Sequence, residues 1–128
     1  MRLLLDTHVL LWAVASSRRL SKEARSLIAD PDNEVFYSAA GLWEISIKSA
    51  LRRSDFRIDV GAFAAALPQT GLSELPVRAS HAVAVAALPD LHRDPFDRML
   101  VAQALTEPLV LITNDPVLVK YPAPVRLI

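Results

Sequence analysis

Two runs of apolar residues, one near each end of the chain, predict strands that are buried on both faces. They cover residues 2–6 and 109–113, and neither alternates between apolar and polar positions. Strands of this kind are typical of parallel sheets that are covered on both sides. Shorter strands are predicted over 34–38, 72–77 and 125–128, the second of them weakened by a proline.

Between these strands, apolar residues recur at helical spacing and stop at residues that favour turns. The segment 68–71 is predicted as a break, and Trp43 is expected in the core with Ile47 and Leu51, on one apolar arc of its helix. Strands that alternate with helices predict an α/β fold with a parallel sheet and helices on both faces. The helices are predicted over 7–14, 21–29, 40–52, 59–67, 79–87, 96–105 and 115–119.

Composition narrows the class of protein. The 128 residues fit a single domain, 1–128, and the absence of cysteine excludes disulfides, thiol nucleophiles and zinc–thiolate sites. The absence of cysteine also suits a reducing cytoplasm, where the protein is expected. No segment is apolar over the roughly 18 residues that a membrane span needs. The 14 basic and 14 acidic residues balance, which leaves nucleic-acid binding without support from net charge. The hydrophobic content of 52% reflects either the many alanines or a surface that a partner buries.

Acidic residues stand where the predicted fold would bring them together. Asp6 ends the first strand and Asp115 closely follows the strand over 109–113, so both lie at the carboxyl edge of the sheet, where α/β folds bind ligands. Glu44 and Asp97 lie among apolar residues on helices. Because ionised carboxylates are rarely buried unless they are paired or bind a metal, this pattern predicts a divalent-metal site. Such sites are typical of magnesium-dependent phosphate chemistry.

Each acid also has a structural explanation. Asp6 is a good helix N-cap, and Asp115 belongs to a turn sequence that continues into Pro116. Glu44 can form an i,i+4 ion pair with Lys48, which would hold the carboxylate while no metal is bound.

The helix predicted from residue 96 has a capping sequence in front of it. Asp94 is the expected N-cap, and Asp97 is either the reciprocal acid of the first turn or a metal ligand. The histidines His8, His81 and His92 are not spaced like a zinc pair. Of the three, His8 is expected near the site, as a half-buried residue or in contact with substrate.

Four segments spread over nearly the whole chain match the motifs of a known family. They are 4–8 with 11–12, 43–45 with Lys48, 92–98 with 102–104, and 111–115. Together and in this order, they resemble the motifs of PIN domains, and among these the VapC-type toxins of bacterial toxin–antitoxin pairs.

The resemblance implies a PIN-like fold with about five parallel strands in the order 3-2-1-4-5. It implies a ribonuclease that depends on Mg²⁺ or Mn²⁺, is usually a homodimer and is inhibited by a cognate antitoxin. Leu51–Asp55 lacks the Gly-Lys-Leu-like turn of many relatives, so contacts of that loop with RNA are not carried over. The implied catalytic acids and metal ligands are Asp6, Glu44, Asp97 and Asp115, with Asp94 as a further ligand and Thr7, Thr113 and Lys48 in supporting roles.

The expected reaction is hydrolysis of an RNA phosphodiester by metal-activated water. Two other classes remain open. One is a non-catalytic PIN-type module that binds RNA or the antitoxin. The other is a phosphatase with Asp6 as nucleophile, although His8 stands where such enzymes usually carry a second Asp.

Overall fold

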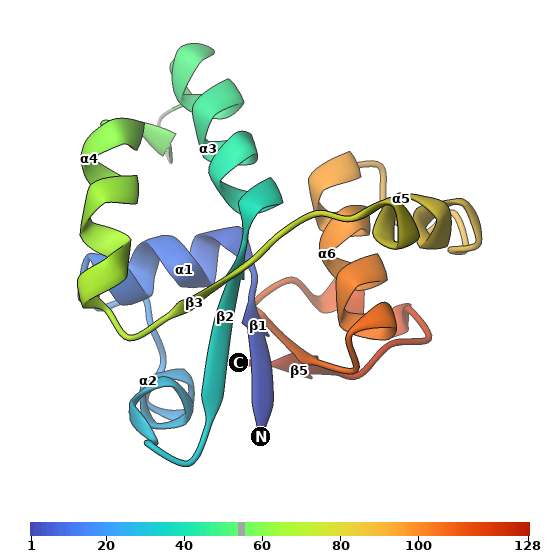
Figure 1. Ribbon diagram of the computed structural model, residues 1–128, viewed down its shortest axis with the longest axis horizontal. Helices are drawn as coiled ribbons and strands as arrows, with labels where there is room; N and C mark the ends of the chain where they lie inside the picture. Colours follow the sequence, from blue (N-terminus) through green and yellow to red (C-terminus); the bar gives the residue numbers. More distant parts are fainter. Residues whose placement is uncertain (54–55) are drawn as a thin grey trace.

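Five parallel strands form one central sheet in the order β3-β2-β1-β4-β5 (Figure 1). The structure is a computed structural model that describes residues 1–53 and 56–128. It confirms the predicted α/β class and the strand order. The strands are β1 (Arg2–Leu5), β2 (Glu34–Ser38), β3 (Ser73–Leu75), β4 (Val110–Thr113) and β5 (Val125–Leu127). The strand β3 ends before Pro76, which lacks the N–H that would continue the ladder.

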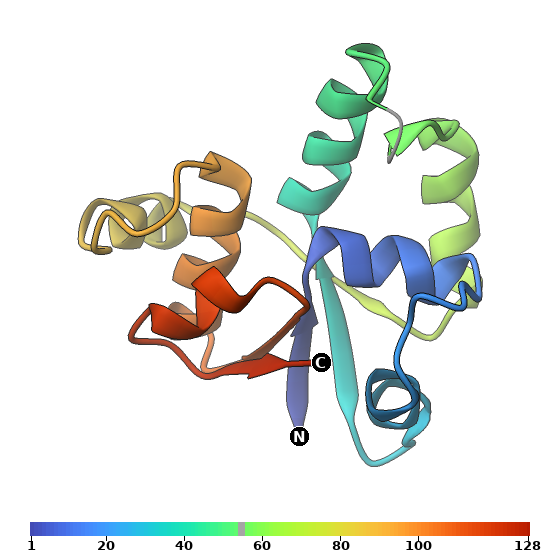
Figure 2. The ribbon, with the colours of Figure 1, turned by 180° about the vertical axis from the view of Figure 1, so that it is seen from behind.

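Helices cover both faces of this sheet. The α-helices are α1 (Thr7–Val14), α2 (Lys22–Ala29), α3 (Ala39–Ala50), α4 (Val60–Ala66), α5 (Ala79–Ala86) and α6 (Pro95–Thr106), and the 3-10 helices include η2 (Leu67–Gln69) and η3 (Pro116–Lys120). Helices α1, α2 and α4 lie on one side of the sheet and α5 and α6 on the other (Figures 1 and 2). The break predicted over 68–71 is wrong in its first residues, because η2 continues from α4. None of the described helices is long and apolar enough to span a membrane.

Successive residues of β1 point into two different cores. Leu3 and Leu5 pack on the side of α1 and α2, together with Leu10. Leu4 packs on the opposite side with residues of α6, among them Leu100. All of these side chains are almost completely buried, which explains why the strand is apolar at every position.

The apolar arc of α3 faces solvent, and the expectation that it joins the core is wrong. Trp43 is 63% exposed and Leu51 is 68% exposed, whereas Glu44 and Ile45 are buried. The side of α3 that carries Ile45 and Lys48 meets Leu11 of α1 and the Asp94 cap of α6. Hydrophobic periodicity alone cannot distinguish a core face from an uncovered apolar face.

A short turn closes α3 and leads to a buried aromatic residue. Leu51 caps the helix, and Arg52 adopts a left-handed backbone conformation with φ of 56°. Phe56 is then fully buried beside Ile45. Of the segment Leu51–Asp55, in which the sequence departs from its relatives, the last two residues, 54 and 55, lie outside the described residues.

Candidate metal centre

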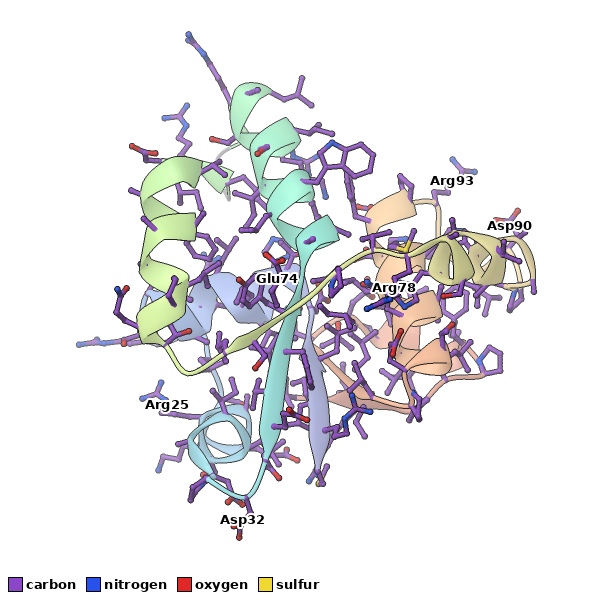
Figure 3. The ribbon with its side chains drawn as sticks, viewed as in Figure 1. Arg25, Asp32, Glu74, Arg78, Asp90 and Arg93 are labelled. Carbon is purple, nitrogen blue, oxygen red and sulfur yellow. The ribbon has the colours of Figure 1, made fainter. Side chains whose placement is uncertain are left out.

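A cavity of about 420 Å³ opens at the carboxyl edge of the sheet. It is lined by Asp6, His8, Glu44, Lys48, Arg53, His92, Asp94, Asp97, Asn114, Asp115 and Pro116. The five predicted acids therefore reach one cavity from β1, α3, α6 and the segment after β4. By contrast, Asp32 beside α2 and Asp90 beyond α5 lie at the surface, outside this cavity (Figure 3).

The pairing of β1 with β4 brings the first and last of these acids together. Leu5 and Ile112 are partners in the ladder, and the Asp6 N–H donates to the Ile112 carbonyl at 2.9 Å. Asp115 follows two residues after the end of β4. Adjacent parallel strands thus place both side chains at the same edge.

A hydroxyl from β4 holds the Asp6 carboxylate. Thr113 Oγ1 donates to Asp6 Oδ2 at 2.5 Å and also accepts the Asp115 N–H at 3.0 Å. Burial raises the pKa of Asp6, and the charge of Glu44 acts in the same direction, while the bond from Thr113 partly opposes them. Asp6 therefore gains from any cation that enters the cavity.

Thr7 differs from its expected role. Its hydroxyl is buried and has no hydrogen-bond partner among the described residues, so the bond expected from this side chain is not formed. The Thr7 backbone N–H instead interacts with the Asp6 carboxylate. The hydroxyl faces α3 at Gly41, where a Cβ would come within 3.3 Å of it.

Lys48 links α3 to the start of α6. Its Nζ donates to Glu44 Oε2 at 2.5 Å, which confirms the i,i+4 pair, and to Asp94 Oδ2 at 2.9 Å. Burial alone would lower the pKa of Lys48, but the two carboxylates outweigh it and raise that pKa. The second Glu44 oxygen, Oε1, is buried and has no hydrogen-bond partner among the described residues.

Asp94 is a helix cap as predicted. Its Oδ1 accepts the Phe96 N–H at 2.8 Å and the Asp97 N–H at 3.4 Å. Burial acts to raise the pKa of Asp94, but Lys48 and these N–H groups lower it overall. The reciprocal bond expected from Asp97 is absent from this helix start, because the Asp94 N–H donates to His92 Nδ1 instead.

His92 is the site residue that sequence reasoning missed. Because its Nδ1 accepts the Asp94 N–H at 3.0 Å, its hydrogen must be on Nε2 in the neutral ring. That nitrogen lies 3.0 Å from Asp115 Oδ2 and 3.3 Å from Asp97 Oδ2, so it donates toward two of the acids. Its place two residues before a predicted helix cap was the available signal, whereas spacing between histidines carried none.

Repulsion among the acids is concentrated on Asp97. Burial, followed by the charges of Asp6, Asp94 and Glu44, raises the pKa of Asp97 to about 8, although Lys48 opposes the shift. Since a carboxylate crowded in this way gains from a cation, the electrostatics suit a metal site.

His8 lines the same cavity and is half-buried, as expected. Its ring lies 5.0 Å from the ring of Phe56 and 6.0 Å from that of Trp12, centre to centre. These contacts fix the ring at the wall of the cavity.

The donor set suits a hard divalent cation. Ligand atoms of His92, Asp97 and Asp115 lie within 4.8 Å of one another. In the tautomer set by Asp94, His92 presents an N–H and not a lone pair, so oxygens are the available donors. Oxygen donors of this kind suit a hard divalent cation, and the buried Glu44 Oε1 beside them has no hydrogen-bond partner among the described residues.

Comparison with known proteins agrees with this arrangement. The model of the PIN domain family matches residues 3–124. The chain belongs to the PIN domain family. A search of curated proteins gives no match to this chain.

Solved structures with the same fold include three VapBC complexes. For VapBC2 from Rickettsia felis, bound to a DNA fragment from its promoter, the TM-score is 0.72 at 14% identity, over 99% of this chain and 98% of that chain. For DNA-bound VapBC from Salmonella typhimurium the TM-score is 0.68 at 18% identity, over 100% of this chain and 97% of that chain. For VapBC-1 from nontypeable Haemophilus influenzae the TM-score is 0.54 at 19% identity, over 90% of this chain and 87% of that chain. At these identities the matches establish the PIN fold and no more.

Proposed function

We propose that residues 1–128 form one PIN domain that acts as a metal-dependent endoribonuclease toxin, paired with an antitoxin. The observation that carries the proposal is the gathering of Asp6, Asp97 and Asp115 in one cavity with an unpartnered oxygen of Glu44. Membership of the PIN domain family and the fold shared with VapBC structures support it.

Asp6, Asp97 and Asp115 would hold the ion, which we propose to be Mg²⁺ or Mn²⁺. Asp115 and Asp6 already accept bonds from neutral donors, but each carboxylate oxygen has a second lone pair. Asp94 is left out of the ligand set because its Oδ2 contacts the Lys48 ammonium, which would repel a metal ion there. When bound, the ion would lower the pKa of a coordinated water and offset the charge of the phosphodiester.

The remaining residues position the reacting groups. Thr113 fixes the rotamer of Asp6 through the bond to Oδ2, and the His92 N–H holds Asp115 and, more weakly, Asp97. Glu44 lines the cavity, and its Oε1 is buried without a hydrogen-bond partner among the described residues. In this proposal Glu44 orients the nucleophile.

The test is cleavage of a mixed pool of single-stranded and structured RNA by the purified chain. Reactions would contain Mg²⁺, Mn²⁺ or EDTA, with Asp97→Asn as the inactive variant and the surface change Asp90→Asn as its matched control. Metal-dependent cleavage that Asp97→Asn reduces by ~10³-fold or more, and that Asp90→Asn leaves intact, supports the proposal. Cleavage that persists in Asp97→Asn contradicts the site, and metal binding without any cleavage favours a non-catalytic binding module.

For the antitoxin, the acidic cavity favours a segment that inserts a basic side chain. Two carboxylates of the cavity, Asp6 and Asp97, have raised pKa values and would each gain from a cationic partner. We propose that this complex forms in the cytoplasm. The affinity of the co-expressed antitoxin should fall at least tenfold in Asp6→Ala and Asp97→Ala, and unchanged affinity would rule out insertion at this cavity.

A homodimer would explain the exposed stripe on α3. Trp43, Ile47 and Leu51 stand four residues apart on one helix face and are all exposed. Trp43→Glu should convert the dimer to a monomer in size-exclusion chromatography with light scattering. Val83→Glu, at a site on α5 that is 73% exposed, is the matched control and should leave the mass unchanged.

A further inference from the structure

The Lys48 ammonium is held inside the acidic cavity and does not extend into solvent. Its side chain is 13% exposed, and Nζ lies within hydrogen-bond distance of two carboxylates, Glu44 Oε2 at 2.5 Å and Asp94 Oδ2 at 2.9 Å. These acids are 50 residues apart in the chain and come from different helices. A lysine on an exposed helix face would form the i,i+4 pair alone, so the second contact is a tertiary feature.

Two aromatic rings also contact this ammonium. Nζ lies 5.1 Å from the centre of the Phe56 ring and 5.8 Å from that of Phe96, both within the range of cation–π attraction. Phe56 is fully buried, and Phe96 occupies the first turn of α6. With two anions and two ring faces around it, the cation has a defined place in the structure.

The charges then divide into two groups. Lys48 pairs with two of the five cavity acids, Glu44 and Asp94. The other three, Asp6, Asp97 and Asp115, meet the neutral donors of Thr113 and His92. Three carboxylates suit one divalent cation, and a second metal ion beside Glu44 and Asp94 would face the ammonium at contact distance.

We propose that Lys48 is a built-in cation that takes the place of a second metal ion, so that the site binds a single divalent ion. The inference rests on the proposed metal site. It adds that the site binds one ion and that Lys48 is the residue that sets this stoichiometry. Lys48 also acts as a positioning residue, because its bond to Oε2 fixes the Glu44 carboxylate in the wall of the cavity.

The experiment counts Mn²⁺ ions on the full chain without RNA. Binding is followed by the electron paramagnetic resonance signal of free Mn²⁺ and by calorimetry at pH 8. The variants are Lys48→Met, which keeps the length and removes the charge, Lys48→Arg, which keeps the charge, and the surface control Lys120→Met. Circular dichroism and thermal unfolding in EDTA report whether each variant folds.

The wild type, Lys48→Arg and Lys120→Met should each bind one Mn²⁺, and Lys48→Met should bind two. If the wild type binds two ions, the proposed role of Lys48 is wrong but the metal site itself is supported. This result does not depend on whether Lys48→Met folds. One ion of unchanged affinity on folded Lys48→Met also overturns it. No binding by the wild type removes the metal site itself, so failure of the proposed function is recognised separately.

Discussion

Thr113 donates its hydroxyl hydrogen to Asp6 Oδ2 at 2.5 Å, although the two residues are 107 positions apart in the chain. The bond joins the ends of β1 and β4 and sets the orientation of an acid at the floor of the cavity. It is buried, so water does not compete for either partner.

Thr113→Val removes this donor and keeps the shape of the side chain. Affinity for Mn²⁺ should fall about 10- to 100-fold, as is usual when a residue that orients a metal ligand is lost. Calorimetric titration measures the change, and Thr113→Ser, which keeps the hydroxyl, should retain most of the affinity. An equal loss in both variants would trace the effect to packing and not to the hydrogen bond.

The stability of the metal-free protein should fall as pH rises from about 4 to about 8. Burial and the neighbouring carboxylates raise the pKa of Asp97 to about 8, so between its ordinary value and 8 the folded state binds more protons than the unfolded state. Its contribution to stability is complete below the ordinary pKa and is lost as pH rises through 8. Urea unfolding in EDTA across this range measures the trend, which should be shallower in Asp97→Asn.

Added Mn²⁺ should reverse that trend. Metal ligands must be deprotonated, so the rise in melting temperature caused by saturating Mn²⁺ should grow from pH 6 to pH 8 and then level off. A thermal-shift series at fixed Mn²⁺ concentration tests this. A rise in melting temperature that is independent of pH would exclude Asp97 as the group that competes with the metal for protons.

Asp94→Asn and Asp94→Ala should have different effects on folding. Asn can still accept the Phe96 N–H as an N-cap. Apart from the loss of the pair with Lys48, the stability of the Asp94→Asn variant should therefore stay within about 1 kcal/mol of wild type. Ala also loses the cap and should cost about 1 kcal/mol more. Guanidinium unfolding compares the two. If Asp94→Asn also abolishes Mn²⁺ binding, Asp94 is a ligand and its exclusion from the ligand set is wrong.

His92→Phe should weaken Mn²⁺ binding without abolishing it. The ring presents an N–H toward Asp115 and Asp97, so it orients ligands, and an affinity loss of about 10- to 100-fold is expected. Asp97→Asn, measured in the same titration, should lose binding altogether. A loss of the same size in both variants would identify His92 as a direct ligand.

Much of the fold followed from local patterns. The ends of α1 and β2 agree with their predicted ranges, because Asp6 and Ser38 begin helices immediately after apolar strands. The strand order was an implication of the family resemblance, since periodicity does not specify which strands are neighbours. The prediction failed at Trp43 and Leu51, where an apolar arc on α3 is exposed.

The sequence by itself determined which residues carry charge and where along the chain strands and helices begin, because these depend on residue type and short-range spacing. It therefore indicated that Asp6, Glu44, Asp97 and Asp115 could converge. Apart from the local Glu44–Lys48 pair and the Asp94 cap, only the tertiary structure decided how the carboxylates are paired. The contacts of Lys48 with Asp94, of Thr113 with Asp6 and of His92 with Asp115 span 46, 107 and 23 positions. Such contacts depend on how the sheet and helices pack, and they divide the five acids into those matched by Lys48 and those left for a metal.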